Sequence, residues 1–120
     1  MAGKVERFED FEVWKKSTEL VITIYKLLKD KREFGLRDQI QRAAVSIPSN
    51  IAEGFERKSN KEFIQYLYIA KGSCGELRTQ FYIAEQIGLK EKETTQKLIE
   101  QAKLISAMLA GHIKTRKKDF

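Results

Sequence analysis

The chain is poor in residues that interrupt helices, form cross-links or bind metals. Its 120 residues include one proline, seven glycines, one cysteine and one histidine. So little glycine and proline excludes a collagenous or low-complexity chain. Cys74 has no second cysteine with which to form an intrachain disulfide, which fits a reducing compartment. One cysteine and one histidine are too few for a transition-metal site, so we expect no metal and no cofactor.

Long apolar runs are missing as well. No stretch approaches the roughly 20 apolar residues that a membrane span needs, and residues 1–7 lack the apolar segment of a secretory signal. Charge is abundant, because 23 Lys and Arg against 17 Asp and Glu give a net charge of +6. We therefore expect one soluble, cytoplasmic domain that does not enter a membrane. Residues 114–120 are expected to form a basic tail, either a solubilising end or a phosphate-binding arm.

Apolar residues recur at helical spacing along most of the chain, and no useful stretch alternates with the period of a strand. The pattern predicts four helices, at about 11–29, 36–55, 60–87 and 90–113. Short connections between them predict an all-α, up-down-up-down antiparallel four-helix bundle over residues 1–113.

Local signals mark the ends and the middle of these helices. Ser59 and Glu62 form a capping box at the start of the third helix, and Gly88 is a suitable stop. Pro48 lies inside the apolar stripe of the second helix. We expect the proline to kink this helix without ending it, with two shorter helices as the alternative.

The first helix is apolar over a wide arc. Two neighbouring stripes together cover about 160° of its surface, more than the ~100° of an ordinary surface helix, and Ile22 lies outside even that arc. Leaving one stripe in water would expose a contiguous apolar strip, which soluble monomers rarely tolerate. We therefore expect a homo-oligomer in which one of the two stripes contacts a second copy. The residues of that stripe are Val13, Leu20, Ile24 and Leu27.

Two further stripes are candidates for binding. The second helix carries a polar stripe that is either a solvated face or a close helix or subunit contact; its residues are Arg42, Ser46, Ser49 and Glu53. The third helix carries a stripe of aromatic and basic side chains; its residues are Tyr68, Lys71, Arg78 and Tyr82. This stripe could bind nucleic acid, because aromatic rings stack on bases and cations hold phosphates. The alternative is that the tyrosines are packing residues whose hydroxyls lie in water.

No group of residues is suited to catalysis. His112 is core-facing near the end of the last helix, and Cys74 lies within the apolar stripe of the third. We expect both to be packing residues. Gly72 and Gly75 lie inside a helix and not in a phosphate-binding loop. The sequence therefore predicts no enzymatic activity.

The run from Gln39 to Phe55, QIQRAAVSIPSNIAEGF, resembles the signature of the 23S ribosomal RNA intervening-sequence protein family, also called a bacterial four-helix-bundle family. Residues 8–14 (FEDFEVW) and 70–80 (AKGSCGELRTQ) support the resemblance. Related proteins include the accessory variability determinant of diversity-generating retroelements. The resemblance implies a four-helix protomer that assembles into a homopentamer. It also implies a link to RNA, to a ribonucleoprotein or to a nucleic-acid-processing partner, and no established enzymatic activity.

Two hypotheses about function follow. The first is a noncatalytic homo-oligomeric scaffold that binds RNA or a nucleic-acid-processing partner. The second is a purely structural protein–protein interaction module with no nucleic-acid role. Phosphate contacts make affinity fall steeply with salt, by about one log-log slope unit per contact, so salt dependence separates the two. The candidate nucleic-acid residues are the stripe on the third helix and the basic tail: Tyr68, Lys71, Arg78, Tyr82, Lys114, Arg116, Lys117 and Lys118.

Overall fold

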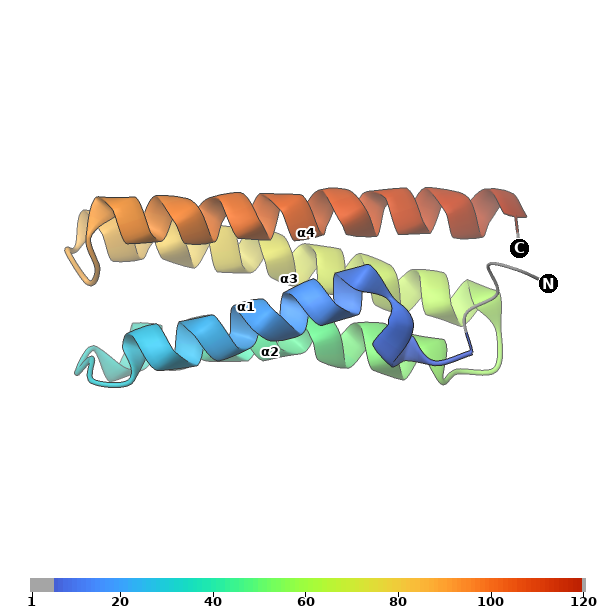
Figure 1. Ribbon diagram of the computed structural model, residues 1–120, viewed down its shortest axis with the longest axis horizontal. Coiled ribbons are helices and arrows are strands. Elements are labelled where there is room, and N and C mark those ends of the chain that lie inside the picture. The colour runs from blue at the N-terminus through green and yellow to red at the C-terminus, as the bar shows by residue number, and fades with distance from the viewer. Residues whose placement is uncertain (1–5, 120) are drawn as a thin grey trace.

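The computed structural model describes residues 6–119, and four helices make up nearly all of this part of the chain (Figure 1). A short 3-10 helix, η1, at Phe8–Asp10 precedes α1. The helices are α1 (Glu12–Leu28), α2 (Phe34–Phe55), α3 (Asn60–Gln86) and α4 (Lys92–Asp119). No strand occurs in the described residues. The predictions of an all-α chain and of four helices are confirmed.

The ends of α3 form as the sequence predicts. The Ser59 hydroxyl accepts a hydrogen bond from the Glu62 backbone N–H at 3.1 Å. Gly88 has a φ of +72°, a left-handed conformation that suits glycine. Beyond the helix, the Leu89 N–H donates to the Ala84 carbonyl at 2.9 Å and the Gly88 N–H donates to the Glu85 carbonyl at 3.2 Å. This pair of bonds is a Schellman motif and satisfies the last carbonyls of α3.

On α2, α3 and α4, the core is formed by the apolar stripes that the spacing predicts. Every stripe residue of α3 is buried: Phe63, Leu67, Ala70, Cys74, Leu77, Phe81 and Ala84. The buried residues of α2 continue on both sides of Pro48, and the helix passes through the proline without ending. The alternative of two shorter helices is therefore wrong. Asn50 lies near the proline, and its side-chain amide donates to the Ser46 carbonyl at 2.8 Å.

The four helices are not packed equally. Figure 1 shows α1 lying along α2 and α4 lying along α3, and α3 also packs extensively on α2. The pairing of α1 with α4 is the least extensive of the contacts between adjacent helices. Glycine allows the close approach of α2 to α3, because a Cβ at Gly54 would lie 2.5 Å from the Cβ of Tyr66. Nearby, the hydroxyl oxygens of Ser46 and Ser73 lie 2.8 Å apart and form a hydrogen bond between the two helices.

The expectation of a separate basic tail from residue 114 is wrong, because α4 continues to Asp119. The reason is a set of contacts with the start of α3. The Arg116 guanidinium lies 4.7 Å from the centre of the Phe63 ring, and the Asn60 side-chain amide donates to the Arg116 carbonyl at 3.0 Å. Basic residues in the last turn also interact favourably with the negative end of the helix dipole.

The stripe of α1 predicted to contact a second copy lies inside the bundle instead. Val13, Leu20 and Ile24 are at most 4% exposed, and Leu27 is half-buried against the same core. All four residues pack in the protomer's own core, so the stripe as a whole is not a subunit contact. Leu20 is buried there and also lines a cleft between α1 and α4. Helical spacing identifies which residues share a face of α1, whereas the positions of α2 and α4 decide which face points inward.

Candidate interaction surfaces

The α3/α4 face, defined here as Tyr68, Lys71, Arg78, Tyr82 and Lys117, carries the predicted aromatic and basic stripe. The two tyrosines are exposed and the two cations between them on α3 are half-buried. Lys117 reaches this stripe from α4, because its Nζ donates to the Tyr68 hydroxyl at 2.6 Å and lies 5.0 Å from the ring centre. The structure thus joins one residue of the predicted basic tail to the stripe on α3.

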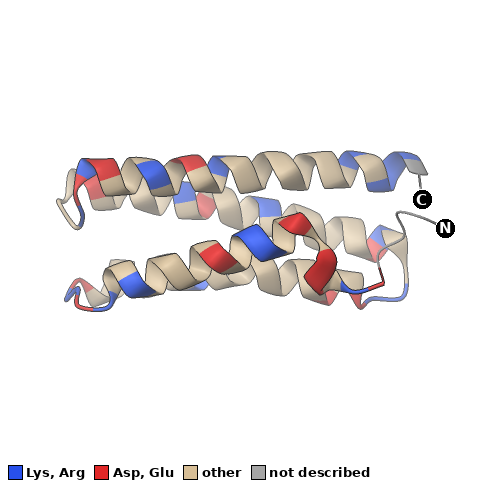
Figure 2. Ribbon diagram, in the orientation of Figure 1, with Lys and Arg blue, Asp and Glu red and all other residues tan. Residues whose placement is uncertain are grey.

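The last turns of α4 are rich in Lys and Arg (Figure 2). Apart from Lys117, these basic residues form two groups that differ in exposure. Lys114 and Lys118 are exposed. Arg116 is half-buried, and besides covering Phe63 its Nη1 donates to the Asn60 side-chain oxygen at 3.4 Å. The contacts of Arg116 hold α4 against α3, so we assign it a structural role and remove it from the candidate nucleic-acid residues.

Cys74 lies beside this face but inside the core. Its side chain is fully buried. Burial raises the pKa of the thiol to about 11, although the nearby charges of Arg78 and Lys71 favour the thiolate. The thiol is therefore protonated at neutral pH and is not a nucleophile. Cys74 is a packing residue, as expected.

An aromatic cluster closes the end of the bundle where α1 begins and α4 ends. The Phe11 ring lies 4.7 Å from the His112 ring and 5.3 Å from the Phe55 ring, and Phe63 lies 5.4 Å from His112. Burial, and then the charge of Arg116, lowers the pKa of His112 to about 4. His112 is thus a neutral packing residue at pH 7, as expected. The cluster was missed in the sequence because its rings come from segments far apart in the chain.

The polar stripe of α2 is divided by the structure. Ser46 is half-buried and bonds to Ser73, so the interpretation as a close helix contact holds for Ser46 within one protomer. Arg42, Ser49 and Glu53 are exposed. Glu53 accepts a hydrogen bond from the Tyr66 hydroxyl at 3.0 Å.

The α1/α2 apolar face was not predicted from the sequence. Its residues on α1 are Trp14, Val21, Ile22 and Tyr25, and its residues on α2 are Val45, Pro48 and Ala52. Ile22 is 50% exposed, Tyr25 45% and Val45 38%, and the other four are half-buried. The α2 residues continue at three- and four-residue spacing to Phe55, whose ring contacts Phe11 beside α1. On α1, Trp14, Val21 and Tyr25 belong to the other of the two apolar stripes that the sequence shows, the one expected to pack inside the protomer. Ile22 lies outside the arc of both stripes.

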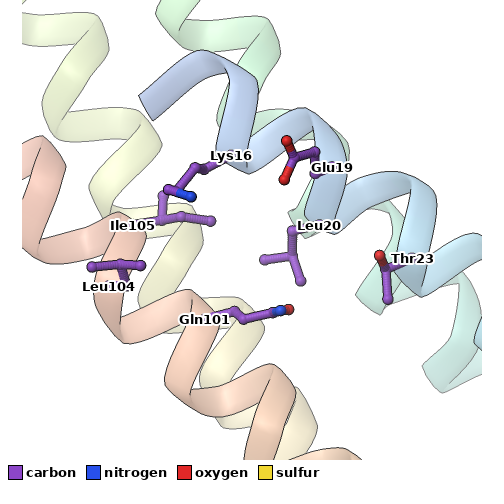
Figure 3. A pocket seen from close by; sticks show the side chains of 7 residues that line it. All are labelled: Lys16, Glu19, Leu20, Thr23, Gln101, Leu104 and Ile105. Carbon is purple, nitrogen blue, oxygen red and sulfur yellow. The ribbon is translucent and has the colours of Figure 1, made fainter. Parts of the chain in front are cut away.

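The α1/α4 cleft lies on the opposite flank of α1 and has a volume of about 150 Å³ (Figure 3). Leu20 and Ile105 line it and are buried, whereas Leu104 beside them is 50% exposed. The remaining lining residues are polar: Lys16, Glu19, Thr23 and Gln101. This least-packed seam therefore combines an apolar floor with a polar rim.

These features define the class of protein as an all-α, four-helix protein whose adjacent helices pack as in a bundle. In the part of the chain that the structure describes, no helix is long and apolar enough to cross a membrane. No group of three or more His, Cys, Asp or Glu residues suited to a metal occurs in residues 6–119.

The chain belongs to the 23S rRNA-intervening sequence protein family, whose family model matches residues 9–111. It is similar to a crystal structure described as a protein with unknown function from the S23 ribosomal protein family of Bacteroides thetaiotaomicron. The two chains are 29% identical, and the match covers 86% of this chain and 99% of that chain with a TM-score of 0.80. The comparison with curated proteins found no match.

Proposed function

We propose that this protein is a noncatalytic scaffold that assembles into a closed homo-oligomer and presents its α3/α4 face to RNA or to a nucleic-acid-processing partner. The number of copies, five, comes from the family resemblance. The observation that carries the proposal is the exposure of three large apolar side chains on the α1/α2 apolar face, Ile22, Tyr25 and Val45, because soluble monomers rarely leave large apolar patches in water. A second copy that covers this face removes the exposure.

Burial of the α1/α2 apolar face alone contributes too little free energy for stable association, so the contact must extend beyond this face. Full burial of one large apolar side chain contributes about 1.5–3 kcal/mol, and Ile22, Tyr25 and Val45 are already half covered. Together they contribute about 3 kcal/mol more when buried, whereas micromolar association requires about 8 kcal/mol. The assembly therefore needs a second surface that contributes apolar area of its own.

Light scattering on the full chain tests the assembly. We expect a mass near five times the 13.9 kDa of one chain at micromolar concentration. Ile22→Glu places a charge on the α1/α2 apolar face and should shift the mass toward that of a single chain. Ile83→Glu is the matched control, because Ile83 on α3 is 46% exposed and lies outside this face. A monomeric wild-type chain contradicts the proposal.

The nucleic-acid part of the proposal is supported by the contact between Tyr68 and Lys117. It places an exposed aromatic ring beside a cation, with Lys71, Arg78 and Tyr82 on the same side of α3. Exposed rings stack on unpaired bases, and neighbouring cations hold the phosphates. The alternative is a protein–protein interaction module in which these charges only solubilise the surface.

A binding titration at two salt concentrations, with single-stranded and with structured RNA, separates the two functions. The double variant Lys71→Ala/Arg78→Ala should weaken binding for all RNA sequences and flatten the dependence on salt. Lys15→Ala/Lys26→Ala, which removes two exposed cations from α1, is the control and should bind as the wild type does. No RNA binding by the wild-type chain favours the interaction module, and unchanged affinity in the double variant excludes the α3/α4 face.

We also propose that the protein is cytoplasmic, and this part and the noncatalytic part of the proposal rest on Cys74 and His112. Cys74 is buried and protonated, and His112 is packed among aromatic rings with a pKa of about 4. Neither is suited to act as a nucleophile or as a general base at neutral pH. A lone, buried thiol also fits a reducing compartment.

A further inference from the structure

The α1/α4 cleft has the shape and chemistry to hold a phenol ring. Its apolar floor is formed by Leu20 and Ile105, and its rim carries Glu19 and Gln101 (Figure 3). A cavity of about 150 Å³ admits a benzene ring. A tyrosine places its ring in apolar surroundings and its hydroxyl where polar groups are available. The cleft therefore fits a tyrosine better than a purely aliphatic side chain.

Tyr25 is a tyrosine of this chain that lacks such surroundings. It is 45% exposed and lies on the α1/α2 apolar face next to Ile22. Tyr25 follows Thr23, which lines the cleft, by two residues, and this spacing turns it about 200° around α1. The side chain thus points away from the cleft of its own protomer, and only a second copy can bring the two together.

We propose that Tyr25 of one copy inserts into the α1/α4 cleft of the next copy. This inference rests on the proposed self-assembly and identifies the second surface that the assembly needs. Leu104, which is 50% exposed at the cleft, supplies apolar area that the α1/α2 apolar face lacks. Because the two surfaces differ, the contact is head-to-tail. Each copy uses one surface of each kind, and such a contact makes a ring when its rotation closes.

Single variants of the full chain test the two sides of the contact by light scattering. Tyr25→Asp removes the inserted ring, and Leu104→Asp places a charge at the cleft. Each should lower the wild-type mass to the 13.9 kDa of one chain. Tyr82→Asp and Ile83→Asp on α3 are matched controls at 46% exposure each, and both should keep the wild-type mass. Circular dichroism checks that every variant retains its helices, and Tyr25→Ser and Leu104→Ser replace any that do not fold.

Mixing the two interface variants provides the decisive measurement. In an equimolar mixture, the intact Tyr25 of the Leu104→Asp chain meets the intact cleft of the Tyr25→Asp chain. One complete contact remains, so a species of twice 13.9 kDa should appear that neither variant forms alone. The inference is overturned if Leu104→Asp keeps the wild-type mass, or if the mixture stays monomeric while the wild type assembles. A monomeric wild type overturns the proposed function itself, and this inference with it.

Discussion

The contact between α2 and α3 (the α2–α3 seam) and the contact between α1 and α4 (the α1–α4 seam) are held together in different ways. Between α2 and α3 the backbones approach closely at Gly54, and the Ser46 and Ser73 hydroxyls bond at 2.8 Å. Between α1 and α4, contact is sparse and a cleft of about 150 Å³ remains. Small residues fix the first seam at the level of the backbone. At the second seam the helices make fewer contacts and leave a cleft lined by side chains of both.

The largest effect is expected where the backbones approach most closely. Gly54→Ala places a Cβ 2.5 Å from the Cβ of Tyr66 and 3.0 Å from a ring carbon of Phe63, so α2 and α3 must move apart. We expect the free energy of unfolding to fall by about 2–4 kcal/mol, measured by urea denaturation.

Gly72→Ala is the matched control, because a Cβ at Gly72 meets nothing within 4 Å. Alanine is the better helix former, so this variant should gain about 0.5–1 kcal/mol. Similar losses at Gly54 and Gly72 would show that glycine has no special role in the α2–α3 seam.

A second prediction concerns the last turns of α4, which contact the start of α3. Removing residues 114–120 deletes the Arg116 guanidinium that covers Phe63 and the carbonyl that Asn60 binds. We expect a loss of about 2 kcal/mol, measured as a lower thermal midpoint. Lys114→Ala/Lys118→Ala alters only exposed cations and should stay within about 0.5 kcal/mol of the wild type. An unchanged midpoint after truncation would mean that these contacts contribute nothing to stability.

The third prediction uses pH to weaken the contact between the Phe11 ring, which precedes α1, and the His112 ring on α4. His112 in the unfolded chain takes up a proton near pH 6.5, whereas the folded protein resists protonation until about pH 4. The free energy of unfolding is therefore highest above pH 6.5 and falls as the pH drops through this window, by about 1–2 kcal/mol at pH 5.

The control for this prediction is His112→Phe, which keeps a ring and cannot titrate. Glu85 and Glu91, whose pKa values are lowered by hydrogen bonds, are present in both proteins, so their titration cancels in the comparison. Equal pH dependence in the two proteins would show that His112 does not resist protonation in the folded state.

The smallest predicted effect compares one hydroxyl from each seam. Ser73→Ala removes the bond to Ser46 and a bond to the Ile69 carbonyl, and should cost about 1 kcal/mol in urea denaturation. Thr23→Ala at the α1/α4 cleft removes an exposed hydroxyl and should change stability by less than about 0.5 kcal/mol. A larger loss at Thr23 would reverse the ranking of the two seams.

The sequence was most informative where the signal is local. The stripe from Phe63 to Ala84, the cap at Ser59 and the stop at Gly88 depend only on neighbours in the chain, and all three were predicted. The face of α1 that points into the core was not predicted. Its apolar arc is so wide that either stripe could face inward, and the positions of α2 and α4 decide between them. The end of α4 was missed because Arg116 is held by the start of α3, more than 50 residues away in the chain.

The sites show the same division between local and distant signals. The spacing of Tyr68, Lys71 and Arg78 placed them on one side of α3, but Lys117 joins them only through the packing of α4. The α1/α2 apolar face and the α1/α4 cleft each combine two helices. The residue spacing along a single helix therefore cannot predict the complete set of residues of either surface.

Because Cys74 is buried, the rate at which a thiol reagent modifies it reports how often the helix bundle opens. A thiol reagent cannot reach a fully buried side chain in the middle of α3, so each modification event requires the bundle to open. The rate of labelling thus measures how often a protomer opens. Assembly that favours the folded protomer lowers that rate by mass action. A labelling rate that falls as the protein concentration rises would report the free energy that the proposed assembly adds to folding, with no variant and no attached probe.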